Sequence, residues 1–150
     1  NNISSQTEAL LFLAARSELV DKVIIQEIEN KKFILCDRFI DSTLAYQAYG
    51  RGLDSDIINE MNLFAIKNIV PQMTIIFDID PSIAQCRINL DNIDRMESSG
   101  IKFQNEVRKG YLKIAKLYSD RCYVINCTDK DIMEIHLKVL DIINLKFLGK

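Results

Sequence analysis

The chain has 150 residues, of which 48% are hydrophobic and 27% charged, and its net charge at pH 7 is −2. This balance excludes a strongly basic surface for nucleic acid, and no apolar run is long enough to span a membrane. Four cysteines without a Cys-x-x-Cys spacing, and a single histidine, predict neither a disulfide framework nor a zinc site. We therefore expect one domain over residues 1–150, in a reducing, cytoplasmic compartment, without nucleic-acid or membrane partners.

The first predicted element is a long helix from about residue 6 to about residue 29, where apolar residues recur densely. Ser5 and Glu8 have the spacing of a capping box, in which each side chain satisfies a backbone donor of the other residue. Phe12 and Arg16 lie four residues apart and therefore share one face of this helix. An aromatic ring beside a guanidinium could hold a nucleobase, whereas a core phenylalanine with a solvated arginine is the ordinary alternative.

A short apolar run, residues 33–36, predicts a strand buried on both faces, and it ends abruptly at Asp37 and Arg38. In an open α/β sheet, ligands bind beyond the carboxyl ends of the strands. Arg38 can grip a phosphate or carboxylate through two parallel hydrogen bonds, and Asp37 can hold a magnesium-bound water or accept a proton. The pair favours phosphoryl transfer, and an ion pair at a strand end is the alternative.

Polar side chains follow this pair in a segment predicted to be helical over residues 42–47. They are Ser42, Thr43, Tyr46 and Gln47. Gly50-Arg51-Gly52 ends the segment, and Asp54 or Ser55 is expected to cap the next helix, which stops before Pro71. The apolar positions predicted for that helix are Ile57, Met61, Phe64 and Ala65.

Strands and helices alternate in the second half of the chain. Such alternation predicts a parallel sheet with right-handed crossovers. A polar stretch over residues 91–100 has the composition of a mobile loop, and its Arg95 could close over a bound phosphate or simply pair with a nearby acid. The expected elements are a strand over 73–79, a helix over 81–90 begun by Asp80-Pro81, a helix over 103–118, a strand over 122–125, and a helix over 132–145 capped by Thr128 or Asp129.

Five motifs occur in a fixed order along the chain. They are Phe12-Leu13-Ala14-Ala15-Arg16, Asp37-Arg38-Phe39, Ser42-Thr43-x-x-Tyr46-Gln47, Gly50-Arg51-Gly52, and Asp94-Arg95-Met96-Glu97. In this order and spacing the sequence resembles bacterial members of the thymidylate kinase family along essentially its whole length. The resemblance implies a three-layer α/β P-loop nucleoside-monophosphate-kinase fold with a parallel sheet. It also implies transfer of the γ-phosphoryl group of ATP to dTMP with Mg²⁺, a step in dTTP synthesis.

The resemblance further implies roles for individual residues. Phe12 would stack on the thymine ring, and Arg16 would hydrogen-bond its carbonyl edge. The catalytic set would be Asp37, Arg38 and Arg95. In that set, Arg38 would hold the dTMP phosphate and Asp37 would organise the magnesium region, with any contact to the metal made through water. Arg95 would lie in a mobile lid at about residues 91–101.

The same resemblance places a further group of side chains near the nucleotide: Ser42, Thr43, Tyr46 and Gln47. Among these, Tyr46 would crowd the 2′ side of the sugar and so disfavour ribonucleotides. The family also implies a homodimer packed through helices, for which the long helix over residues 6–29 is the expected surface.

Two departures from the family pattern stand out. Phe39 occupies a position usually held by a hydroxylated aromatic or a histidine. More seriously, no Gly-x-x-x-x-Gly-Lys-[Ser/Thr] loop occurs among the 150 residues. In the family this loop, with a first strand and a first helix, precedes the helix of Phe12, so we expect the chain to be N-terminally incomplete.

Without that loop, residues 1–150 are expected to be inactive alone, because losing even one such phosphate contact costs about 10²–10³-fold in rate. Two other functions stay open: a non-catalytic nucleotide-binding or dimerisation module, and a related kinase for another nucleotide.

Overall fold

The computed structural model describes residues 3–87 and 100–149. The chain forms two compact units, Asn1–Val70 and Pro71–Lys150. Arg95 and most of the loop predicted at about residues 91–101 lie outside the described residues. Within the described ranges, no helix combines the length and the apolar character needed to cross a membrane.

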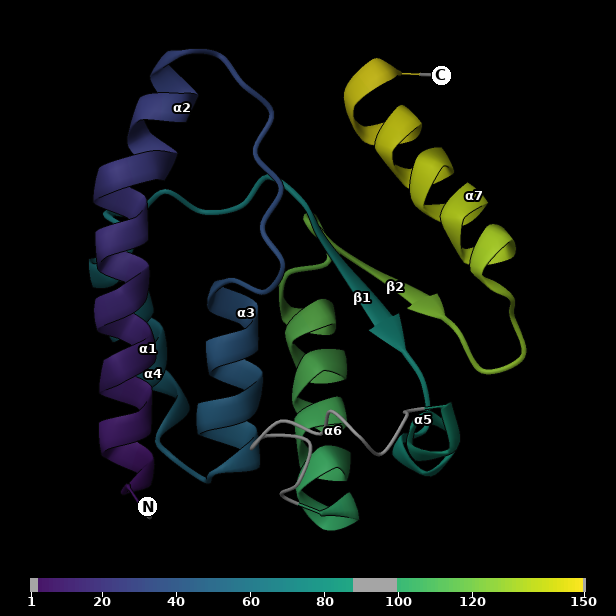
Figure 1. Ribbon diagram of the computed structural model, residues 1–150, viewed down its shortest axis with the longest axis horizontal. Helices are drawn as coiled ribbons and strands as arrows, with labels where there is room; N and C mark the ends of the chain where they lie inside the picture. Colours follow the sequence, from purple (N-terminus) through teal and green to yellow (C-terminus); the bar gives the residue numbers. More distant parts are fainter. Residues whose placement is uncertain (1–2, 88–99, 150) are drawn as a thin grey trace. The chain divides into compact units, whose positions relative to one another are not determined.

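The first unit begins with the predicted long helix (Figure 1). It consists of α1, Ser5–Leu19, a π-helical turn, Val20–Ile24, and α2, Ile25–Glu29. The predicted cap is wrong by one residue, because Ser4 is the N-cap and its hydroxyl accepts a hydrogen bond from the Thr7 backbone N at 3.1 Å. Glu8 does not complete a capping box, since its carboxylate accepts hydrogen bonds from side chains distant in the sequence.

The strand predicted over residues 33–36 is not formed in the part of the chain that the structure describes; the segment is irregular. Phe33 and Leu35 are 68% and 90% exposed, whereas Ile34 packs against the core between them. The prediction of a buried strand is therefore wrong, because a strand requires hydrogen bonds to a neighbouring strand, which a local pattern does not contain.

The predicted helix after Arg38 is confirmed and is longer than expected. It comprises α3, Ile40–Thr43, and a π-helical stretch, Leu44–Gly50, which ends at the predicted Gly-Arg-Gly corner. There Gly52 has a φ of 76°, a left-handed conformation that glycine adopts without steric cost.

Helix α4, Ser55–Ala65, is capped by Asp54, whose carboxylate accepts from the backbone N of Asp56 and Ile57. The predicted apolar stripe of this helix is wrong in part, because Ile57 and Phe64 are 57% and 87% exposed. Ala65 is buried as predicted, together with Ile58 and Asn62. The core of the unit is formed by Val20, Ile24, Ile40 and Ile66.

The second unit contains a parallel sheet, as predicted, but in the described residues it is formed by only two of the three expected strands (Figure 1). Strand β1, Thr74–Asp78, pairs with β2, Cys122–Asn126, with Thr74 opposite Cys122 and Asp78 opposite Asn126. Because the strands are parallel, their carboxyl ends, at Asp78 and Asn126, lie at the same edge of the sheet.

The helices of this unit in the described residues are α5, Pro81–Arg87, α6, Ile101–Leu117, and α7, Ile132–Ile143, which a π-helical turn, Asn144–Leu148, continues. Helix α6 packs on both strands and α7 packs on β2. The cap predicted for α7 is wrong: Asp131 is the N-cap and forms a capping box with Glu134, because these two residues have the spacing that satisfies both backbone donors.

Candidate active site

Asp37 and Arg38 lie exposed on the turn between the extended segment and α3. The backbone of Arg38 is left-handed, with a φ of 65°, a conformation that non-glycine residues rarely adopt. The guanidinium carbon of Arg38 lies 5.2 Å from the centre of the Tyr46 ring. Such a conformation costs on the order of 1–3 kcal/mol. Because Lys31, Lys67 and Asn68 adopt it as well, Arg38 is a candidate binding residue through its exposed side chain and not through its backbone alone.

Arg16 projects from α1 to the first turn of α3 and to α4. It donates hydrogen bonds to Thr43 Oγ1, to the Phe39 carbonyl oxygen at 3.0 Å, and to Asn62 Oδ1 at 3.2 Å. Its guanidinium carbon also lies 5.2 Å from the centre of the Phe39 ring. The Arg16 side chain is therefore fixed by hydrogen bonds, unlike most arginines on helices, which extend into solvent.

The other predicted site residues lie at different depths around these two arginines. Phe12 is 44% exposed and lies one turn before Arg16 on α1, and Ser42 is half-buried. Thr43 is buried at 4% exposure and contacts Arg16 directly. The structure thus brings together Arg16 with Thr43, and Arg38 with Tyr46.

Gln47 is 1% exposed and belongs to a buried polar cluster with Glu8 and Arg51. Its Nε2 donates to Glu8 Oε1 at 3.2 Å, and Arg51 donates to both oxygens of Glu8 at 3.0 and 3.3 Å. Gln47 Oε1 is buried with no hydrogen-bond partner among the described residues. This cluster joins the first turn of α1 to the Gly-Arg-Gly corner, and it was not predicted from the sequence.

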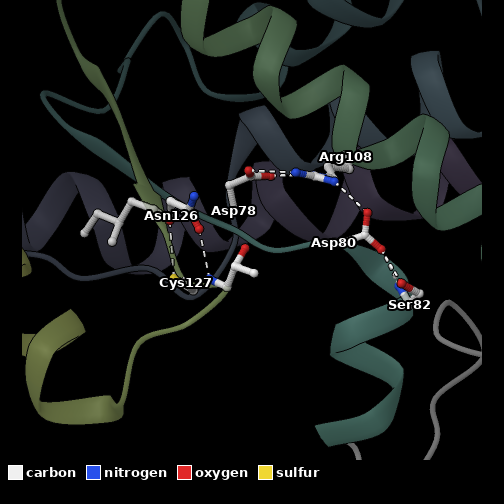
Figure 2. Close-up of polar contacts among 8 residues, drawn as sticks. Asp78, Asp80, Ser82, Arg108, Asn126 and Cys127 are labelled. Carbon is white, nitrogen blue, oxygen red and sulfur yellow. Dashed lines mark hydrogen bonds and ion pairs between the residues drawn. The ribbon is translucent and has the colours of Figure 1, made fainter.

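A second charged group, also missed from the sequence, lies at the carboxyl end of β1 (Figure 2). Arg108 of α6 donates to both oxygens of Asp78, at 2.7 and 3.0 Å, and to Asp80 Oδ2 at 3.1 Å. The signal that could have found it is the one used at residues 33–38: acidic residues directly after an apolar strand. The group fixes α6 to the strand end and to the start of α5.

Hydrogen bonds at this strand end shift two pKa values. The Ser82 hydroxyl and backbone N donate to Asp80 Oδ1, at 2.5 and 2.9 Å, and with Arg108 nearby they lower the pKa of Asp80. Hydrogen bonding to Asp78 raises the pKa of Arg108. Both shifts favour the charged forms, so the group is ionic at neutral pH.

We expect Ser82→Ala to raise the pKa of the Asp80 carboxyl toward its ordinary value, because the strongest hydrogen bond to its charged form is lost. A carboxyl with a lowered pKa stabilises the folded state above its unfolded pKa, and this stability is lost as the pH falls through the folded pKa. An NMR titration of the Asp80 side-chain carbon in both proteins measures the shift. Equal titration midpoints of Asp80 in the two proteins would contradict a role for the Ser82 hydrogen bonds.

The residues around Asp37 are compatible with a magnesium ion held jointly with a substrate. Among the described residues, no cluster of three or more His, Cys, Asp or Glu side chains could hold a metal ion alone. Magnesium is commonly held by one or two carboxylates together with substrate phosphates. Asp37, exposed and next to Arg38, fits that arrangement.

Parallel strands joined through helices define an α/β protein. The family model described as thymidylate kinase matches residues 1–139. The chain belongs to the thymidylate kinase family, and this membership makes it a kinase of the α/β P-loop class, as the resemblance implied.

Individual relatives agree with this assignment. The chain is 38% identical to a thymidylate kinase of Bacillus cereus over 149 residues, covering 97% of this chain and 71% of the relative. It is 46% identical to a thymidylate kinase of Geobacillus over 129 residues, covering 84% and 61%. The crystal structure of thymidylate kinase from Ehrlichia chaffeensis superposes with a TM-score of 0.77 at 34% identity, covering 95% of this chain and 68% of that one.

Proposed function

We propose that the protein phosphorylates dTMP to dTDP with ATP as the donor and Mg²⁺ as the metal, a step in dTTP synthesis. The observation that carries this proposal is the pair of arginines in the first unit: Arg16, held by three acceptors, and Arg38, exposed on a left-handed turn. Membership of the thymidylate kinase family supports it.

In this proposal Phe12 and Arg16 bind the base. The exposed Phe12 ring stacks on thymine, and the held guanidinium of Arg16 hydrogen-bonds its carbonyl edge. Ser42 and Thr43 line the same region, and Tyr46 lies against the sugar. Gln47 is buried behind them and donates to Glu8, so in this proposal it supports the site without touching the nucleotide.

Phosphoryl transfer requires positioning and dispersal of negative charge more than covalent chemistry by the protein. Arg38 holds the dTMP phosphate, Asp37 would hold a bound Mg²⁺ through water, and Arg95 covers the transferred group. Mg²⁺ supplies charge neutralisation between the two nucleotides when bound. Because no phosphate-cradling loop occurs in residues 1–150, we propose that these residues alone do not form ADP.

The protein is also proposed to act as a homodimer through the long helix, in the cytoplasm. A groove between α1 and α4 supports this proposal, because its lining is mostly apolar and its walls include Leu10 and Phe64, at 53% and 87% exposure. A second copy of the chain would cover these side chains.

The proposed reaction is tested by comparing dTMP, dUMP and dCMP as acceptors for the full-length protein with ATP and Mg²⁺. We expect a higher kcat/KM with dTMP than with dCMP, since in this proposal Arg16 bonds a carbonyl edge that cytosine replaces by an amino group. Faster turnover of dCMP would identify a related kinase. Tight dTMP binding without any ADP release would indicate a binding module.

A further inference from the structure

Arg16 is fixed by contacts from two other helices, and the contact from α4 comes from a single buried side chain, Asn62. This asparagine is 1% exposed, although it lies on a helix without any predicted site residue. Its Oδ1 accepts from Arg16 Nη1 at 3.2 Å, and its Nδ2 donates to the Ile40 carbonyl oxygen at 3.2 Å. Both ends of the amide are therefore occupied.

The chemistry of these partners determines the orientation of the Asn62 amide. A guanidinium only donates hydrogen bonds and a carbonyl oxygen only accepts them. If the amide rotated by half a turn, its NH₂ group would face the donor Arg16 and its oxygen would face the Ile40 carbonyl oxygen, so neither hydrogen bond could form. Asn62 thus links Arg16 to the first residue of α3. A buried group of this kind has one favourable geometry, which it imposes on the guanidinium.

We propose that Asn62 is a positioning residue for the nucleobase, acting through Arg16. This inference rests on the proposed function, because it assigns Arg16 to the base of the acceptor nucleotide. Asn62 holds the guanidinium in the orientation that its bonds to Thr43 and to the Phe39 carbonyl also require. Removing Asn62 leaves the charge of Arg16 in place and loosens its direction.

The expected result is a selective loss of acceptor binding. Asn62→Ala should weaken dTMP binding by about tenfold, as expected for a lost hydrogen bond to a charged group. The KM for ATP should stay within about twofold of the wild-type value, because the donor contacts are not touched. Asn62→Asp retains an oxygen acceptor for Arg16 and should recover part of the loss.

Asn59 offers a matched control on the same helix, one turn earlier. Asn59→Ala removes the same chemical group without touching Arg16, and we expect dTMP binding within about twofold of wild type. Thermal unfolding of each variant separates a loss of fold from a loss of binding. If Asn62→Ala does not fold, Asn62→Asp together with Asn62→Ser provides the measurement.

The decisive experiment is a double-mutant cycle in the full-length protein, with dTMP affinity measured by calorimetry. If Asn62 acts through Arg16, Asn62→Ala should have no further effect in an Arg16→Ala background. Additive losses would overturn the inference while leaving the proposed function intact, provided that the wild type phosphorylates dTMP. A wild-type protein that neither binds nor phosphorylates dTMP would overturn both.

Discussion

Replacing Arg38 by alanine is expected to lower kcat/KM for dTMP by about 10²–10³-fold, the cost of losing one preorganised donor to a charged reacting group. The guanidinium is exposed on a left-handed turn and stacks near Tyr46, so its loss removes charge and direction together. The kcat/KM of Arg38→Lys should lie between those of the wild type and Arg38→Ala, because an ammonium keeps the charge but cannot form the two parallel hydrogen bonds of a guanidinium. Initial rates of ADP formation in the full-length protein measure the effect.

Two controls make this result specific. Arg38→Gly removes the same guanidinium but accepts a φ of 65° without steric cost, so a similar loss of turnover with unchanged stability isolates the side chain. Lys22→Ala removes an exposed cation elsewhere on the same unit, and turnover should not change. A rate for Arg38→Ala within about threefold of wild type would show that Arg38 does not contact the reacting phosphate.

Among the substitutions considered, Arg51→Met is expected to lower the free energy of unfolding most, by about 3 kcal/mol. The substitution removes the bidentate partner of Glu8, a carboxylate whose side chain is only 7% exposed, and breaking a buried ion pair from one side typically costs about 3–5 kcal/mol. The lower end applies because the Arg51 side chain is itself 22% exposed. Urea unfolding of the full-length protein provides the measurement.

A second substitution, at Glu8, tests whether the unpaired carboxylate causes the loss of stability. In Glu8→Gln/Arg51→Met the buried charge is removed together with its partner, while an oxygen acceptor stays for Gln47, so much of the lost stability should return. If the double variant is as unstable as Arg51→Met, packing of the arginine stem and not the stranded carboxylate accounts for the loss. An oxygen acceptor for Gln47 Nε2 remains at position 8 in both variants, which keeps the comparison matched.

Local patterns in the sequence were sufficient for most helices and for both strands of the sheet. Periodicity found the helix that runs from Ser5 to Glu29, and the Gly-Arg-Gly corner ended the following helix as predicted. Whether residues 33–36 form a strand could not be predicted from their own pattern, because a strand forms only where a neighbouring strand provides hydrogen bonds. The capping box predicted at Ser5 was wrong for a related reason. The Glu8 carboxylate binds Gln47 and Arg51, which lie 39 and 43 positions further along the chain.

For the candidate site, too, the sequence predicted some residues and missed others. Motifs indicated Arg16 and Arg38, but their partners depend on contacts between separate helices. Asn62 leaves one signal in the sequence, a polar residue on the face shared by Ile58 and Ala65, and the importance of such a residue becomes clear only when its partners are known. The roles of the predicted site residues toward a nucleotide stay predictions.

The buried pair of Glu8 and Arg51 also bears on the order of events in folding. The two residues are 43 positions apart, so the chain must close a long loop before the ion pair forms. Contacts of this separation generally form after neighbouring helices have assembled, and interactions absent from the transition state act on the unfolding rate. We therefore expect this pair to make the first unit kinetically persistent, with little influence on how fast it folds.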